Sequence, residues 1–163
     1  MESDIERKIL AIDPGTQVMG WCVISGNRRI QKFIDGGATR VSSPKAEIGL
    51  LKIFKTVLDL IVQYSPEIVV VESPFYGENT KTLIRLGEAR GAILLASATA
   101  KLPIAQITPA EVKLALTGNG NARKEQVAYM VKTILSPKKE LPLDATDAAA
   151  VAVAFLQRGL PNE

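Results

Sequence analysis

The sequence contains no histidine and only one cysteine, Cys22, in 163 residues. These absences exclude an internal disulfide, a Cys/His zinc site and a histidine-based catalytic triad. Any catalysis must therefore use carboxylates, lysines or hydroxyls, and any metal site must be built from oxygen ligands, which suit hard ions such as Mg²⁺ or Mn²⁺. We expect Cys22 to be a small buried strand residue in a reducing compartment.

Long hydrophobic runs are also missing. No stretch approaches the roughly 18 uncharged apolar residues that a membrane span requires. Residues Met1 to Lys8 form a short charged tail without the apolar segment of a secretory signal, so we expect a cytoplasmic protein with no membrane contact. The composition that is present, 47% apolar and 23% charged, is typical of one globular domain with a single continuous core.

The positive charge is concentrated in one part of the chain. Between Lys101 and Lys139 there are seven basic residues and two acidic ones, a local charge of +5 in a chain whose net charge is +3. Such a stretch fits a surface that binds a phosphate backbone. Lysines that only solvate exposed helix faces would give the same pattern, and charge alone does not decide between the two interpretations.

Apolar runs and turn signals predict an α/β domain with a mixed sheet, in the order β-β-β-α-β-α-β followed by helices. Gly36-Gly37 predicts a break or bulge near the end of the third strand, and Thr108 and Pro109 are expected to begin a helix as N-cap and first residue. The folded domain is expected to cover 8–157, between short tails at 1–7 and 158–163. Strands are predicted near 8–12, 18–24, 29–34, 68–71 and 104–107, and the longer helices near 44–64, 79–100, 127–135 and 144–156.

Four carboxylates stand at the ends of predicted elements. Asp13 ends the first strand and Glu72 the fourth, while Asp144 and Asp147 lie three residues apart on one face of the last helix. If the first and fourth strands are neighbours, Asp13 and Glu72 lie side by side at a sheet edge where α/β sites are usually built. Taken singly, each acid also has a structural explanation. Asp13 and Glu72 would simply mark where a strand ends at the solvent-exposed surface, Asp144 would be an N-cap, and Asp147 would be a favourable charge near the positive end of the helix dipole.

Four motifs occur together in one order along the chain: Ile12-Asp13-Pro14-Gly15-Thr16, Val71-Glu72-Ser73-Pro74-Phe75, Leu86-Gly87-Glu88-Ala89-Arg90-Gly91 and Asp144-Ala145-Thr146-Asp147-Ala148. Together they resemble the bacterial RuvC family of Holliday junction resolvases, over about residues 8–156. The resemblance implies a ribonuclease-H-like fold, with a five-stranded mixed sheet flanked by helices in a single domain. The first motif alone is a weak signal, because many ribonuclease-H-like and actin-like proteins begin with it. The four motifs together are specific.

The resemblance implies a Mg²⁺-dependent hydrolase that resolves Holliday junctions by paired symmetric nicks, in homologous recombination and DNA repair. Asp13, Glu72, Asp144 and Asp147 would bind two Mg²⁺ ions, for which Mn²⁺ can substitute, on either side of the scissile phosphate. Some relatives carry histidine at the position of Asp144.

For DNA binding, the resemblance implies that Lys113, Arg123 and Lys124 contact phosphates and that Phe75 stacks on a base at the junction centre. Lys124 would alternatively supply positive charge to the transition state, and the sequence does not separate these roles. The resemblance further implies a homodimer formed through the helix near 79–100, and a branch-migration helicase as partner.

Three other functions use the same features. An actin-like or sugar-kinase-like ATPase would use Asp13-Pro14-Gly15-Thr16 as a phosphate-binding turn, but such proteins need two related lobes and 163 residues supply one. A non-catalytic nucleic-acid module would use the basic segment without metal. A ribonuclease-H-like nuclease acting on RNA would use the same acids. No feature of the sequence indicates whether the substrate carries a 2′-hydroxyl.

Overall fold

The computed structural model describes residues 5–73, 77 and 79–159. Its single five-stranded sheet has the order β3-β2-β1-β4-β5. The first three strands form an antiparallel meander, while β4 and β5 run parallel to β1. The predicted mixed sheet is therefore confirmed. The strands are β1 (Arg7–Asp13), β2 (Val18–Gly26), β3 (Gln31–Arg40), β4 (Ile68–Glu72) and β5 (Ile104–Ile107).

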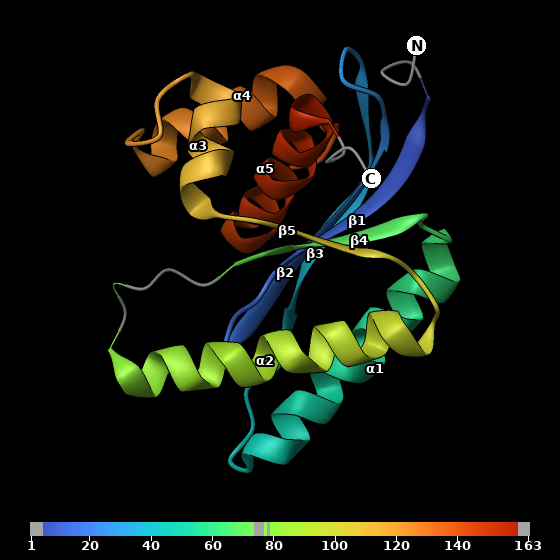
Figure 1. The fold of residues 1–163 in the computed structure, drawn as a ribbon, viewed down its shortest axis with the longest axis vertical. Coiled ribbons are helices and arrows are strands. Elements are labelled where there is room, and N and C mark those ends of the chain that lie inside the picture. The colour runs from blue at the N-terminus through green and yellow to red at the C-terminus, as the bar shows by residue number, and fades with distance from the viewer. Residues whose placement is uncertain (1–4, 74–76, 78, 160–163) are drawn as a thin grey trace.

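Helices cover both faces of the sheet (Figure 1). Because side chains alternate along a strand, β1 sends Leu10 and Ile12 into one apolar cluster and Ile9 and Ala11 into the other. The first cluster is closed by α1 (Ala46–Tyr64) and α2 (Thr80–Thr99), and the second by α3 (Pro109–Thr117), α4 (Lys124–Leu135) and α5 (Leu143–Arg158). Among the described helices, none is long and apolar enough to cross a bilayer.

The third strand differs from its prediction. It runs on through Gly36-Gly37 to Arg40, and its register irregularity lies just before these glycines, where Ile34 of β3 has no partner between Val23 and Ile24 of β2. The glycines do not end the strand. They leave room for packing, because a Cβ on Gly37 would lie 2.8 Å from the Trp21 ring. Beginning at Arg7 and ending at Arg158, the regular structure extends one residue beyond each predicted domain boundary.

Two local features fix the ends of helices beside the sheet. At the start of α3, the Thr108 hydroxyl accepts from the Glu111 N–H (3.2 Å) and the Glu111 carboxylate accepts from the Thr108 N–H (2.8 Å), which confirms Thr108 as N-cap and Pro109 as first residue. At the edge strand β3, Asp35 accepts from the Tyr64 hydroxyl (2.5 Å) and from Lys139. These contacts tie the end of α1 and the loop before α5 to the same strand.

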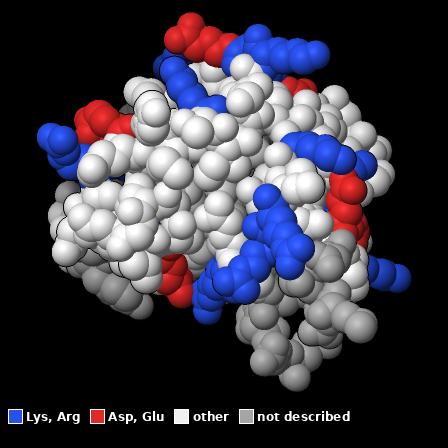
Figure 2. Space-filling view, turned by 90° about the horizontal axis from the view of Figure 1, so that it is seen from above, with Lys and Arg blue, Asp and Glu red and all other residues white. Residues whose placement is uncertain are grey.

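Lys and Arg side chains do not form one continuous patch on the face shown in Figure 2. Lys and Arg side chains there form several separate groups, interrupted by Asp and Glu, around a broad area that carries no charge. The segment from Lys101 to Lys139 is divided among α3, α4 and the connecting loops. Any phosphate contact by this segment is therefore made by particular lysines rather than by one continuous surface.

Candidate active site

Asp13 and Glu72 end adjacent parallel strands. The register pairs Ile9 with Ile68 and Ile12 with Val71, so the next residues along each strand are the two acids. Both continue the alternation that points Ala11 and Val70 toward α5, and both therefore lie on the α5 face of the sheet. The prediction that the first and fourth strands are neighbours is confirmed.

The start of α5 brings two more carboxylates to this place. The helix has Pro142 at its N-cap, and the Pro142 carbonyl accepts from the Thr146 N–H (2.9 Å) and from the Thr146 hydroxyl (3.2 Å). Asp144 thus lies within the first turn, so the N-cap interpretation of Asp144 is wrong. With Asp147 one turn further on, both acids lie near enough to Asp13 to raise its pKa.

Burial and mutual repulsion dominate the electrostatics of the cluster. Burial first, and then the negative charges of Glu72, Asp147 and Asp144, raise the pKa of Asp13 to about 8. Burial also raises the pKa of Glu72 and of Asp147 above their ordinary values. A side-chain hydrogen bond between Asp13 and Glu72 further raises the pKa of Asp13 and opposes the effect of burial on the pKa of Glu72.

Two of the predicted lysines lie beside these acids. Lys124, at the start of α4, places its Nζ 3.5 Å from Asp147 Oδ2, and the charge of Asp147 raises the pKa of Lys124. Lys124 and Lys113 both lower the pKa of Glu72, against the larger effect of burial. Because the Lys124 side chain is 83% exposed, it can reach a bound phosphate as well as Asp147.

The donor set fits a divalent ion such as Mg²⁺. Within the described ranges, no group of three His, Cys, Asp or Glu side chains is already arranged to hold a metal. The chemistry of the cluster nevertheless favours one, because all its donors are oxygens and because burial, and then the neighbouring acids, disfavour the negative charge of Asp13, which a cation would stabilise. Asp13, Glu72, Asp144 and Asp147 are the residues that would hold such an ion, whose positive charge would offset the repulsion among their carboxylates.

Two predicted DNA-binding residues are not brought to the cluster by any described contact. Arg123 is exposed and immediately precedes α4, where its backbone N–H donates to Gln126 Oε1 (2.9 Å). Phe75 lies outside the described residues. Cys22 is buried, as expected, and burial raises its pKa to about 12, which makes it an unreactive thiol.

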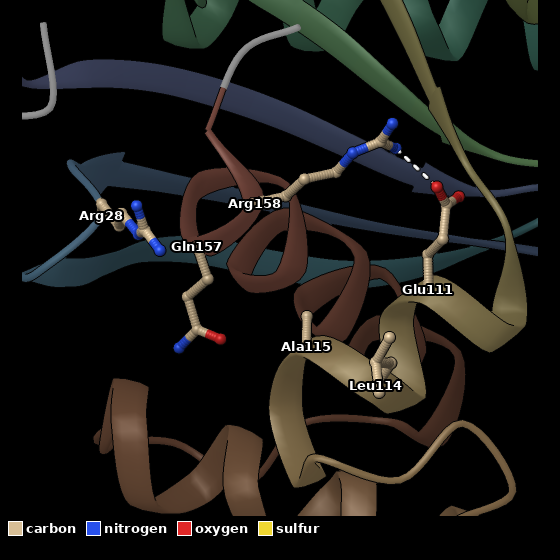
Figure 3. Close-up of a pocket in the computed structure, with 6 residues that line it drawn as sticks. All are labelled: Arg28, Glu111, Leu114, Ala115, Gln157 and Arg158. Carbon is tan, nitrogen blue, oxygen red and sulfur yellow. Dashed lines mark ion pairs between the residues drawn. The ribbon is translucent and has the colours of Figure 1, made fainter.

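A hollow of about 570 Å³ is lined by the residues labelled in Figure 3. It is bounded by α3, by Arg28 of the β2–β3 turn, and by Gln157 and Arg158 at the last turn of α5, whereas Asp144 and Asp147 lie in the first two turns of that helix. Its one carboxylate, Glu111, is paired with Arg158 at 2.7 Å. The hollow therefore lacks the acids that phosphodiester hydrolysis by metal ions requires.

Comparisons with known proteins agree with this geometry. The family model described as "Crossover junction endodeoxyribonuclease RuvC" matches residues 9–155. The chain belongs to the RuvC family. Members of this family are metal-dependent endonucleases. RuvC of Christiangramia forsetii is 42% identical over 151 residues, covering 91% of this chain and 78% of the relative, and that of Desulforamulus reducens is 41% identical, covering 91% and 93%.

Solved structures of relatives have the same fold as this chain. Thermus thermophilus RuvC has a TM-score of 0.81 at 33% identity, covering 90% of this chain and 92% of that one. A second structure, of the same protein in complex with a Holliday junction substrate, has a TM-score of 0.84 at 32% identity, covering 91% and 92%. The yeast mitochondrial Holliday junction resolvase, at 13% identity and a TM-score of 0.70, shares the fold. The ribonuclease-H-like fold that the motifs implied is therefore confirmed.

Proposed function

We propose that this chain resolves Holliday junctions as a structure-selective DNA endonuclease, in homologous recombination and DNA repair. The observation that carries the proposal is the gathering of acids from two neighbouring strand ends and from the first two turns of α5, in a chain of the RuvC family. The Thermus thermophilus relative, which is similar over 91% of this chain, was solved with a Holliday junction substrate. DNA as substrate also fits a cytoplasmic location for a bacterial-type enzyme.

The four acids Asp13, Glu72, Asp144 and Asp147 would hold two Mg²⁺ ions, with Mn²⁺ as a substitute. When bound, two such ions supply an activated water on one side of the phosphorus and charge stabilisation for the departing 3′-oxygen on the other. Asp13, whose pKa is raised to about 8, would lose its proton when an ion binds, and the position of Asp13 and Glu72 at adjacent strand ends fixes the spacing of the site. The low dielectric produced by their burial strengthens each of these electrostatic interactions.

The basic residues have separate roles in the proposal. Lys124 leaves Asp147 for the scissile phosphate and adds positive charge where the transition state is most negative. Lys113 and Arg123 bind neighbouring phosphates of the same strand, and their contribution is expected to weaken as salt increases. Phe75, which directly follows the Glu72 segment, stacks on a base at the junction centre.

A two-fold homodimer would supply one site for each of the two symmetric nicks. The exposed side of α2 suits this contact, because it combines apolar residues, Ile84 at 58% and Leu95 at 61% exposure, with the small residues Gly87 and Gly91. A branch-migration helicase is the further partner that we propose for the complex on the junction.

The test is cleavage of a synthetic four-way junction in Mg²⁺, compared with a linear duplex and an RNA–DNA hybrid. We expect paired, symmetric nicks with ligatable ends on the junction alone, and no cleavage by Asp13→Asn. Equal cutting of the duplex would contradict structure selectivity, and cutting of the hybrid alone would assign the chain to RNA. Metal-independent binding without cleavage would indicate a non-catalytic module.

A further inference from the structure

The start of α5 lies directly on the backbone of β2 at Gly20. A Cβ built on Gly20 would lie 1.9 Å from the carbonyl oxygen of Asp144, 2.4 Å from its carbonyl carbon and 3.0 Å from its Cβ. Two of these three atoms are backbone, so rotation of a side chain cannot relieve the overlap. Only a residue without a side chain permits this approach.

This contact occurs beside the candidate metal site. The antiparallel register pairs Gly20 with Asp13, so the backbone of Asp144 rests on the residue opposite the strand-end acid. Gly20 is buried and lies on the same face of β2 as Cys22 and Ile24, which pack under α5. The distance between the strand acids and the helix acids is therefore set where the helix meets Gly20.

The rest of α5 shows that the close approach is a general property of this layer. The helix packs on β1 and β2, and its fully buried positions there are mostly alanines, among them Ala145, Ala148, Ala149 and Ala152. Alanine is small enough for those positions on the helix. At position 20 of the strand even the Cβ of alanine has no room, and this close approach lies beside the acids.

We propose that Gly20 is a positioning residue for the metal site, which sets how near Asp144 and Asp147 lie to Asp13 and Glu72. This inference rests on the proposed function, since it concerns the same four acids. A Cβ at position 20 would displace the first turn of α5 by at least about 1 Å, because Cβ atoms essentially never approach another heavy atom within 3.0 Å. Ligand distances to Mg²⁺ are held near 2.0–2.1 Å, so a shift of this size removes a ligand from the site.

The experiment compares the full chain, Gly20→Ala and Val57→Ala as a control. Val57 is fully buried in α1 on the other face of the sheet, so its truncation lowers the melting temperature without touching α5. The dissociation constant of Mn²⁺ is measured by titration calorimetry at a temperature where circular dichroism shows each protein folded. We expect a constant at least tenfold higher for Gly20→Ala and within twofold of the parent for Val57→Ala. An unchanged constant in Gly20→Ala would overturn the proposal.

A double-variant cycle separates positioning from a loss of stability. If Gly20 acts by positioning the α5 acids, adding Gly20→Ala to Asp144→Asn should weaken Mn²⁺ binding by a smaller factor than Gly20→Ala weakens it in the parent, because one of the displaced ligands is already lost. If the decreases in Mn²⁺ binding free energy caused by Gly20→Ala and by Asp144→Asn are fully additive, positioning of the α5 acids by Gly20 is contradicted. A parent that binds no Mn²⁺ would overturn both this inference and the proposed function, whereas normal junction cleavage and Mn²⁺ binding by Gly20→Ala would overturn the inference alone.

If Gly20→Ala does not fold, a second variant keeps the contact testable. Asp144→Gly removes the nearest Cβ and frees the backbone of the first turn to move away from position 20. The double variant Gly20→Ala/Asp144→Gly should then recover a cooperative thermal transition, while Asp144→Gly should not raise the melting temperature of the parent or of Val57→Ala. A double variant that remains unfolded would contradict the proposed contact.

Discussion

Asp13→Asn is expected to change catalysis and stability in opposite directions, because the buried Asp13 is needed for cleavage but destabilises the metal-free fold when it is charged. The parent carboxyl has a pKa of about 8 in the folded protein, raised by burial and then by the neighbouring acids, against an ordinary value of 3.8. An acid whose pKa is higher in the folded state stabilises the fold fully below its unfolded value, and this contribution is lost as the pH rises through the folded value. The metal-free parent should therefore become less stable between about pH 4 and pH 8.

The size of the effect follows from the same shift. One pKa unit corresponds to about 1.4 kcal/mol, so at pH 7 the metal-free parent has lost up to about 4 kcal/mol that an uncharged side chain would keep. Asparagine carries no charge, and its amide can donate to Glu72 as the protonated carboxyl does. Asp13→Asn should therefore raise the free energy of unfolding at pH 7 while abolishing cleavage, and the gain over the parent should disappear near pH 4.

The assay is urea unfolding of both proteins in chelator at pH 4, 5.5, 7 and 8, repeated with saturating Mg²⁺. The metal should stabilise the parent, by about 2.7 kcal/mol at a concentration of 100 times its dissociation constant, and should leave Asp13→Asn nearly unchanged. Equal stability of the two proteins at every pH would refute the electrostatic reasoning. Equal stabilisation by Mg²⁺ would remove Asp13 from the metal site.

Three further predictions concern Lys124 and Phe75, which belong to the proposed site, and Asp35 on the edge strand. Lys124→Ala should reduce junction cleavage at least tenfold and lower the affinity for Mg²⁺ little, because it removes a cation and no ligand; single-turnover kinetics with a Mg²⁺ titration checks this, and unchanged kinetics would contradict it. Phe75→Ala should preserve folding and Mn²⁺ binding but impair junction resolution, and equal resolution by parent and variant would exclude base stacking. Asp35→Asn should lower the free energy of unfolding by about 1 kcal/mol at pH 7, because hydrogen bonds from Lys139 and Tyr64 hold the pKa of Asp35 below its ordinary value despite burial. That loss should disappear as the pH falls through the folded pKa below 3.8, and a difference that persists in acid would contradict it.

The strand-end acids could be predicted from the sequence because their signals are local. An apolar run that stops at Asp13 or Glu72 and is followed by a proline turn predicts both the strand and its end. Parallel pairing of β1 with β4 then brings the two ends to one edge of the sheet. The helix beginning with Thr108-Pro109 was predictable for the same reason, since its capping residues are within four positions of each other.

The features that could not be predicted depend on contacts between distant parts of the chain. Gly20 lies within a strand pattern, where a glycine signals close approach of another backbone, but nothing near it in sequence identifies Asp144 as the neighbour. Gly36-Gly37 gives the same local signal as a break, and only the position of the Trp21 ring shows that the pair makes room for packing. The pairing of Asp35 with Lys139 spans 104 positions and likewise has no local sign.

The most direct test of the account is anomalous diffraction from crystals of the parent protein soaked in MnCl₂. The account predicts two manganese peaks among Asp13, Glu72, Asp144 and Asp147, about 3.5–4 Å apart. The carboxylates of Asp13 and Glu72 are both expected to be ligands. Saturating manganese that leaves this edge of the sheet without a peak, or that binds only elsewhere on the chain, would contradict it.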